Sequence, residues 1–186
     1  MRKLSHDEIS ASRSTLETLH SVKKLPVYVL LNSIRSSYNV GSIFRTSDGA
    51  MIEKLILCGF TPHPPKEGVS SGKKDVFKTA LGSTQSVNWE YVKNPLDAIK
   101  EIKSNGIKVC ALELTENSKP YYDLTEKDFP LCLVVGNEIT GVSQEILDLC
   151  DYSIEIPQYG IKQSLNVSVA YGIAIFELRK MFDLAN

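Results

Sequence analysis

Short apolar runs alternate with segments of helical periodicity along the 186-residue chain, and this alternation restricts the fold more than the composition does. "VYVLLNSI" (27–34) and "KLILCGF" (54–60) are rich in strand-forming residues, and "NVGSIFRTSDGAM" (39–51) between them has apolar residues at helical spacing. A strand, a helix and a second strand in this order form a β-α-β unit. Such a unit favours parallel strands joined by a right-handed crossover.

Two later runs extend this pattern into a sheet that is buried on both faces. "IKVCALEL" (107–114) and "FPLCLVVG" (129–136) are continuously apolar, which is typical of strands covered by helices on both sides. Further helices are expected over 76–82, 94–106, 143–150 and 164–182, and further strands over 86–92 and 152–157. The sequence therefore predicts an α/β fold with a mostly parallel sheet and helices on both faces.

Capping residues mark where several of these helices begin. Asn94, followed by Pro95, is expected to cap the helix over 94–106, and Ser143 the short helix after it. The proline-rich and glycine-containing segment "TPHPPKEGVSSGKKD" (61–75) is expected to be an exposed loop.

The N-terminal residues differ in character from the rest. Ser5 and Glu8 have capping-box spacing and predict a helix over residues 5–22. We expect residues 1–24 to form a helical arm and residues 25–186 to form one domain. Hydrophobic residues make up 42% of the whole chain, which is enough for this domain to bury a sizeable core.

Composition excludes some settings and leaves others open. No apolar run approaches the roughly 20 residues that span a bilayer, and the first ten residues lack the apolar stretch of a secretory signal. The four cysteines have no CxxC pair and are expected to be buried thiols, so a cytoplasmic location is the default. Lys and Arg total 21 against 22 Asp and Glu, which neither indicates nor excludes an RNA partner.

Three polar, glycine-containing stretches follow predicted strands, namely 32–46, 136–143 and 157–166. Open parallel sheets bind ligands at the carboxyl ends of their strands. Each stretch alone could be a simple turn, but three at strand ends predict one shared site.

The sequence lacks the residues that several common kinds of catalytic or cofactor site require. "GNEITGVS" (136–143) resembles a phosphate loop, but Val142 stands where the lysine is required, and the chain has no GxGxxG fingerprint for a dinucleotide-dependent oxidoreductase. The three histidines lie outside the polar stretches, so neither a Ser-His triad nor a metal site is expected. The ionisable residues that remain in the stretches suit a polar cofactor and an anionic substrate; they are Arg35, Arg45, Asp48, Glu138 and Lys162.

The motifs "NVGSIFRT" (39–46), "LVVGNEITGVS" (133–143) and "IPQYGIKQSLNVSVA" (156–170) resemble, in order and spacing, those of the SpoU (TrmH-like) family of RNA ribose 2′-O-methyltransferases in the SPOUT superfamily. Gln158 replaces the usual Met of the third motif, and Ser42 replaces a common Ala of the first. Neither change removes a polar group on which the family depends.

The resemblance implies a parallel α/β fold with a C-terminal deep trefoil knot, the cofactor S-adenosyl-L-methionine, and a homodimer whose active site lies at the subunit interface. It also implies an RNA substrate, with no membrane and no metal. We favour tRNA over rRNA, because a 24-residue arm is too short for a separate RNA-binding domain. The alternative is a catalytically inactive RNA-binding protein of the same fold.

The resemblance also assigns residues. The catalytic set it implies is Asn39, Arg45, Glu138, Ser164 and Asn166. The cofactor set is Leu112, Gly136, Ile156, Gln158, Ser164, Leu165 and Asn166.

The expected roles of these residues differ. Arg45 would bind phosphate and stabilise the developing alkoxide, because a guanidinium stays protonated and is a poor base. The proton would leave to a phosphate oxygen or water. Glu138 would hydrogen-bond Asn39 or nearby backbone. Gln163, Ser164 and Asn166 could instead be plain capping residues of the last helix, with Ser164 the first choice, but ligand contact is favoured over capping alone. Lys162 and Gln163 individually are expected to be surface residues.

Overall fold

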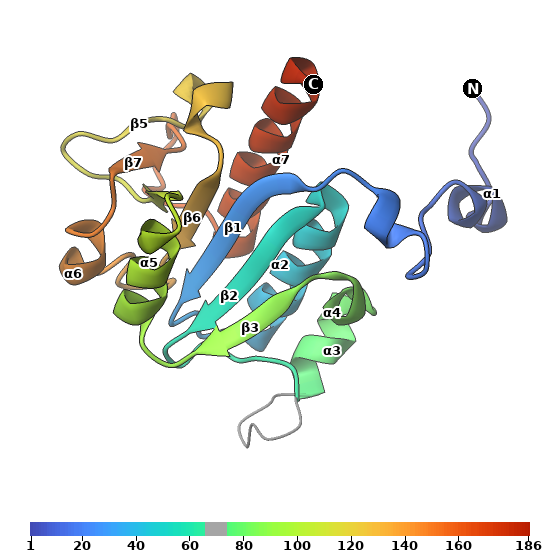
Figure 1. Ribbon diagram of the computed structural model, residues 1–186, viewed down its shortest axis with the longest axis horizontal. Coiled ribbons are helices and arrows are strands. Elements are labelled where there is room, and N and C mark those ends of the chain that lie inside the picture. Colours follow the sequence, from blue (N-terminus) through green and yellow to red (C-terminus); the bar gives the residue numbers. More distant parts are fainter. Residues whose placement is uncertain (66–73) are drawn as a thin grey trace.

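The computed structural model describes residues 1–65 and 74–186, and within them the chain forms a sheet flanked by helices (Figure 1). The sheet has seven strands in the order β3-β2-β1-β6-β4-β7-β5, and every adjacent pair is parallel. The strands are β1 (Leu25–Asn32), β2 (Ile52–Cys58), β3 (Trp89–Val92), β4 (Lys108–Leu112), β5 (Lys119–Pro120), β6 (Leu131–Val135) and β7 (Tyr152–Glu155). The predicted parallel sheet is confirmed, and the two-residue strand β5 is an addition to it.

The helices α2 to α6 lie between these strands in sequence, α1 precedes the first strand and α7 follows the last. They are α1 (His6–Ala11), α2 (Ser37–Ala50), α3 (Lys74–Ala80), α4 (Ser83–Ser86), α5 (Pro95–Ser104), α6 (Gln144–Leu147) and α7 (Val167–Ala185). Short 3₁₀ turns occur at η1 (Leu19–Ser21), η2 (Tyr121–Asp123) and η3 (Glu126–Asp128). Within the described ranges no helix is both long enough and apolar enough to cross a membrane.

Helices cover both faces of the sheet, as the continuously apolar strands predicted. Val29 and Leu31 of β1 belong to one buried cluster together with residues of α2 and α7. Leu30, between them in sequence, belongs to a second cluster with residues of α5 and α6. Successive side chains of a strand point to opposite faces, so an unbroken apolar run supplies both cores at once.

The cap residues follow the prediction in part. The Asn94 side chain accepts a hydrogen bond from the Leu96 amide at 3.1 Å, with Pro95 in the first turn of α5. Ser143 occupies the capping position of α6, but its side chain makes no capping hydrogen bond. The last helix begins later than expected, because Asn166 is its cap and accepts from the Ser168 amide at 2.9 Å. Of the three residues that could cap this helix, Asn166 does so, and the choice of Ser164 as the cap is wrong.

The predicted helix over residues 5–22 is wrong beyond its first turns. Ser5 and Glu8 form the expected capping box, yet α1 ends at Ala11 and has no buried residue. A short helix that packs against nothing lacks the tertiary contacts that sustain most helices. The hydroxyls of Thr15 and Thr18 also bond to backbone groups locally, which competes with helix formation.

The arm lies apart from the sheet at its start and returns to the domain before β1 (Figure 1). Arg179 of α7 donates to the Lys23 carbonyl at 3.1 Å, and Lys23 donates to the Asn186 side chain at 2.7 Å. Whether residues 1–24 act as a separate unit stays a prediction. Much of the loop predicted over 61–75 lies outside the described residues.

The cysteines agree with the expectation of unpaired thiols. Cys58, Cys110 and Cys132 are free and buried, and Cys150 is free and half-buried. Burial raises the pKa of the Cys58 thiol to about 12 and that of Cys150 to about 11, so both are protonated near neutral pH.

Close packing of α3 on α2 generates a first prediction, which concerns Gly41. A Cβ at this position would lie 2.7 Å from Cβ of Thr79 and 2.8 Å from the carbonyl oxygen of Val76. Gly41→Ala must therefore push the two helices apart, and we expect a loss of about 1–3 kcal/mol in the free energy of unfolding measured with urea.

Gly49→Ala in the same helix is the matched control. Its added Cβ would meet Phe176 at an ordinary 3.5 Å. This substitution should be neutral or should stabilise by up to about 1 kcal/mol, since alanine is the better helix former. Equal effects of the two substitutions would contradict the packing account.

Candidate functional site

A cavity of about 630 Å³ opens at the carboxyl ends of β4, β6 and β7. Its lining comes from the ends of those strands, from the turn after β6, and from the segment that leads from β7 into α7. This is the edge at which parallel sheets bind ligands, and the volume lies within the roughly 300–1,000 Å³ of small-molecule sites.

Glu138, in the turn after β6, fastens that turn to the start of α2. Its carboxylate accepts the backbone amides of Arg35 at 2.8 Å and Ser36 at 3.1 Å, and the side-chain amide of Asn39 at 3.0 Å. The amides at a helix N-terminus have no partner within the helix, and the helix dipole favours negative charge there. Glu138 therefore joins the first and second polar stretches, and the hydrogen bond to Asn39 expected from the sequence is present.

Asn39 continues the connection to the third stretch. Asn166 donates to the Asn39 side-chain oxygen at 3.2 Å, while its own oxygen accepts from Ser168. One chain of hydrogen bonds thus runs from Glu138 through Asn39 to the start of α7. The prediction that the three stretches meet at one place is confirmed in geometry.

The turn after β6 is closed by contacts that sequence reasoning missed. Asn137 and Gly141 form an antiparallel bridge with amide-to-carbonyl distances of 3.1 and 2.9 Å. The Asn137 side chain also donates to the Ser33 carbonyl at 2.7 Å and accepts from the amides of Ile139 and Thr140. An asparagine that begins a glycine-ended turn was the available signal.

Glu113, just after β4, holds the other side of this turn. Its carboxylate accepts the Val142 amide at 2.8 Å and the Leu114 amide at 3.1 Å. Gly141 has φ of +66°, and a Cβ there would collide with the Glu113 carboxylate. A Cβ at Gly136 would collide with the backbone of Gly141 itself. Both glycines are therefore needed for the turn to close against β4.

The structure brings most of the predicted cofactor residues to the cavity. Those that line it are Leu112, Gly136, Ile156, Gln158, Ser164 and Leu165. Asn166 follows the last of these but is not in the lining itself. Lys162 and Gln163, expected to be surface residues, are exposed and also line the cavity.

Arg45, unlike most of the predicted cofactor residues, does not lie at the cavity. It is exposed on α2, and neither Arg45 nor Asn39 is among the described residues that line the cavity. A helix turns about 100° per residue, so six residues put Arg45 roughly 120° around α2 from Asn39 and about 9 Å along its axis. Arg45 therefore lies in the middle of α2 (Ser37–Ala50), away from the end at which Asn39 lies. Within residues 1–65 and 74–186 the Arg45 guanidinium has no hydrogen bond or ion pair with other described residues.

The charges around the cavity are mostly negative. Glu113, Glu138, Glu155 and Lys162 are the ionisable residues of its lining. Burial raises the pKa of the Glu138 carboxyl, but hydrogen bonds from the Arg35 amide, Asn39 and the Ser36 amide outweigh this and lower it below the ordinary value of 4.5. The cavity therefore favours a ligand that carries positive charge.

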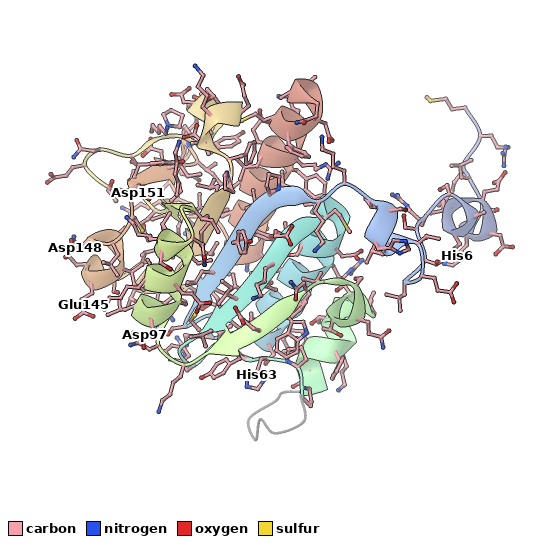
Figure 2. The ribbon with its side chains drawn as sticks, in the orientation of Figure 1. His6, His63, Asp97, Glu145, Asp148 and Asp151 are labelled. Atoms are coloured by element: carbon pink, nitrogen blue, oxygen red, sulfur yellow. The ribbon has the colours of Figure 1, made fainter. Side chains whose placement is uncertain are left out.

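Neither a metal centre nor a histidine belongs to this cavity. Among the described residues no group of His, Cys, Asp and Glu could hold a metal ion. Figure 2 places His6 in the arm and His63 beyond β3, far apart, and neither lines the cavity.

Together these features define a class of protein. It is a parallel α/β domain with a ligand-sized cavity at the carboxyl edge of the sheet, walled by backbone, amide side chains and carboxylates rather than by a nucleophile and base. Residues 26–176 match the SpoU rRNA Methylase family, and the chain belongs to this family.

Known proteins with similar sequences and folds agree with this assignment. A tRNA (guanosine(18)-2′-O)-methyltransferase of Aquifex aeolicus (strain VF5) is 35% identical over 154 residues, which are 82% of this chain and 68% of that protein. The crystal structure of the A. aeolicus TrmH/SpoU tRNA modifying enzyme has a TM-score of 0.76 at 31% identity, covering 91% of this chain and 83% of that one. The AdoMet-bound rRNA methyltransferase of Sinorhizobium meliloti has a TM-score of 0.74 at 29% identity, covering 87% of this chain and 59% of that one.

The environment of Glu138 generates a second prediction. Its folded-state pKa is depressed, so its stabilising contribution is complete above the ordinary value of 4.5 and is lost as the pH falls through the folded-state pKa. The free energy of unfolding of the wild type should exceed that of Glu138→Gln by a constant amount near neutral pH. That difference should shrink at more acid pH, as measured by urea unfolding at a series of pH values.

Subtracting the free energy of unfolding of the variant from that of the wild type at each pH removes the contributions of the other acidic groups. A difference that is the same at neutral pH and at about pH 3 would show that the charge of Glu138 does not hold α2.

Proposed function

We propose that this chain transfers the methyl group of S-adenosylmethionine to a ribose 2′-hydroxyl of RNA. The observation that carries the proposal is the cavity at the carboxyl edge, whose walls are built from the second and third SpoU motifs and are joined to the first by the Glu138–Asn39–Asn166 hydrogen bonds. Family membership and a relative of 29% identity whose structure is described as AdoMet-bound support the same donor.

The residues present fit this donor. Leu112, Ile156 and Leu165 offer apolar surface, and Gly136 presents backbone in the wall of the cavity. The negative lining suits a cationic sulfonium compound. When bound, the donor supplies a methyl group already activated by the positive sulfur, so the protein has chiefly to orient the two reactants.

Arg45 is proposed to act on the RNA. A guanidinium forms two parallel hydrogen bonds with a phosphate and can stabilise negative charge that develops on the attacking ribose oxygen. Because a guanidinium does not give up its proton at physiological pH, a phosphate oxygen or water would accept the ribose proton. Ser164 and Asn166 are proposed to contact the ribose and the donor, and Asn39 and Glu138 to hold the loops in place.

In a homodimer, Arg45 of one subunit could reach the cavity of the other subunit. Arg45 stands on the exposed side of α2 seven residues from Tyr38, which is 65% exposed, so the two share a face. The neighbouring helix α7 exposes Val169 and Phe176, and Phe176 approaches Gly49 on the same side of α2. We propose that this α2–α7 face joins a second copy, and that Arg45 serves the cavity of that copy.

The proposed fold includes a C-terminal trefoil knot. The segment after β7 leads back past the carboxyl ends of β4 and β6 to Asn166, which is bonded to Asn39 of α2. A path that returns past two strands and lines the same cavity as the turn after β6 is compatible with threading of the chain. Knots are otherwise nearly absent from proteins, so the family resemblance carries this part.

The substrate is proposed to be tRNA before rRNA, because a relative of 35% identity is named as a tRNA enzyme, whereas the rRNA enzyme is 29% identical. A cytoplasmic location goes with either RNA. The rival is an inactive RNA-binding protein of this fold. Calorimetric titration with S-adenosylmethionine separates the two, since the rival predicts no donor binding.

A third prediction concerns Arg45→Lys. The substitution keeps the charge but loses the paired hydrogen bonds, so transfer to RNA should fall by about 10²-fold or more. Binding of S-adenosylmethionine, measured by calorimetry, should be unchanged because Arg45 is outside the described lining of the cavity. The substrate is bulk RNA from cells that lack the gene, and the ribose-methylated nucleosides formed on it are measured by mass spectrometry. If Arg45→Lys turns over at close to the wild-type rate, the proposed role of Arg45 is contradicted.

A fourth prediction tests whether sites are shared between copies. Arg45→Ala and Ile156→Arg, the second of which fills the cavity, should each be inactive. Mixed after unfolding and refolding together, they should regain activity, because one site of a mixed dimer then has both intact parts. The control is each variant refolded alone, and a mixture that stays inactive while forming dimers would place Arg45 in its own subunit's site.

A further inference from the structure

Three tyrosines lie beside the mouth of the cavity, and the mechanism above gives none of them a role. Tyr159 stands within the third motif, whereas Tyr121 and Tyr122 lie outside all three motifs. Tyr159 is 92% exposed and Tyr122 is 50% exposed, while Tyr121 is half-buried. The rings of Tyr121 and Tyr122 meet edge to face, with centroids 5.1 Å apart. Exposed aromatic side chains that gather in one place, unlike single ones, mark an interaction surface.

The sheet brings these residues together from distant parts of the sequence. Strand β5 pairs in parallel with β7, with Lys119 opposite Ile154 and Pro120 opposite Glu155. Tyr121 and Tyr122 therefore leave the sheet at the same edge as the segment that holds Tyr159. Burial, and then the nearby Tyr159 hydroxyl, raise the pKa of Tyr122, so the two side chains lie close to each other.

The cluster adjoins the donor cavity. Gln158 and Gly160, the two sequence neighbours of Tyr159, line the cavity, and so does Ile161, which is 99% exposed. A target ribose must reach the cavity mouth for transfer to occur. The nucleotides on either side of the target then have to pass over this rim.

Chemistry favours a nucleobase over other occupants of the cluster. Single-stranded RNA is recognised largely by stacking of its bases on aromatic side chains, and tyrosine adds a polar tip that can remain in water. By contrast, the surface over α5 and α6 carries Asp97, Glu145 and Asp148 (Figure 2), and these carboxylates repel phosphate, whereas Asp151 beside them is paired with Lys103.

We propose that the tyrosine cluster of Tyr121, Tyr122 and Tyr159 is a stacking platform for an unpaired base of the RNA that flanks the target nucleotide. This inference rests on the proposed methyltransferase function and extends it to the form of the substrate: the target would lie in a loop or other unpaired segment. Tyr159 supplies the most accessible ring of the three, and the paired rings of Tyr121 and Tyr122 form the other part of the platform.

The test uses the full chain and bulk tRNA prepared from cells that lack the gene. Tyr159→Ala and Tyr122→Ala should weaken tRNA binding in a filter assay by about tenfold each, the usual order for one stacked base. Tyr159→Phe keeps the ring and should stay within about twofold of wild type. Calorimetric affinity for S-adenosylmethionine and the mass in solution by light scattering should not change in any variant.

The possible outcomes separate this inference from the function on which it rests. Wild-type tRNA affinity in both alanine variants would overturn the platform and leave the methyltransferase proposal intact. Loss of the oligomer, or of donor affinity, in Tyr159→Ala would also overturn it, because the cluster would then serve a second copy or the donor. A wild-type protein that binds neither donor nor tRNA would overturn both proposals.

Discussion

The carboxylate of Glu138 is the contact on which the arrangement of the site depends. It accepts two backbone amides at the start of α2 and the Asn39 side chain, at 2.8 to 3.1 Å. Hydrogen bonds to an ionised group are stronger than neutral ones, and amides at a helix N-terminus lack other partners. One side chain in the turn after β6 thereby fixes the direction in which α2 leaves the sheet.

The rest of the site follows from this anchor. With α2 fixed, Asn39 holds Asn166, which begins α7, and the buried hydroxyls of Ser47 and Tyr171 bond at 2.7 Å to keep the two helices together. The turn itself stays closed because Glu113 accepts the Val142 amide. Polar loops in these positions leave a cavity between them instead of collapsing onto the sheet.

The pattern of apolar residues along the sequence predicts the main strands of the sheet, but it does not predict the contacts of the site. Runs such as 27–34 and 129–136 encode parallel strands because burial on both faces demands unbroken apolar residues. The prediction of a long helix in the arm is wrong because the pattern of Ser5 and Glu8 indicates where a helix begins. It does not indicate whether tertiary packing is present to extend that helix. The contacts of Asn137 with Ser33 and of Glu113 with Val142 are tertiary, so no local pattern could assign them. The position of Arg45 outside the cavity follows from helix geometry, which the family motif does not convey.

Amide hydrogen exchange with and without S-adenosylmethionine tests the central claim most directly. If the loops after β6 and β7 enclose the donor, peptides covering 136–142 and 156–166 will both become protected. Peptides of α5, on the far side of the sheet, will exchange at unchanged rates. Protection confined to another region, or the absence of any change at saturating donor, would contradict the account.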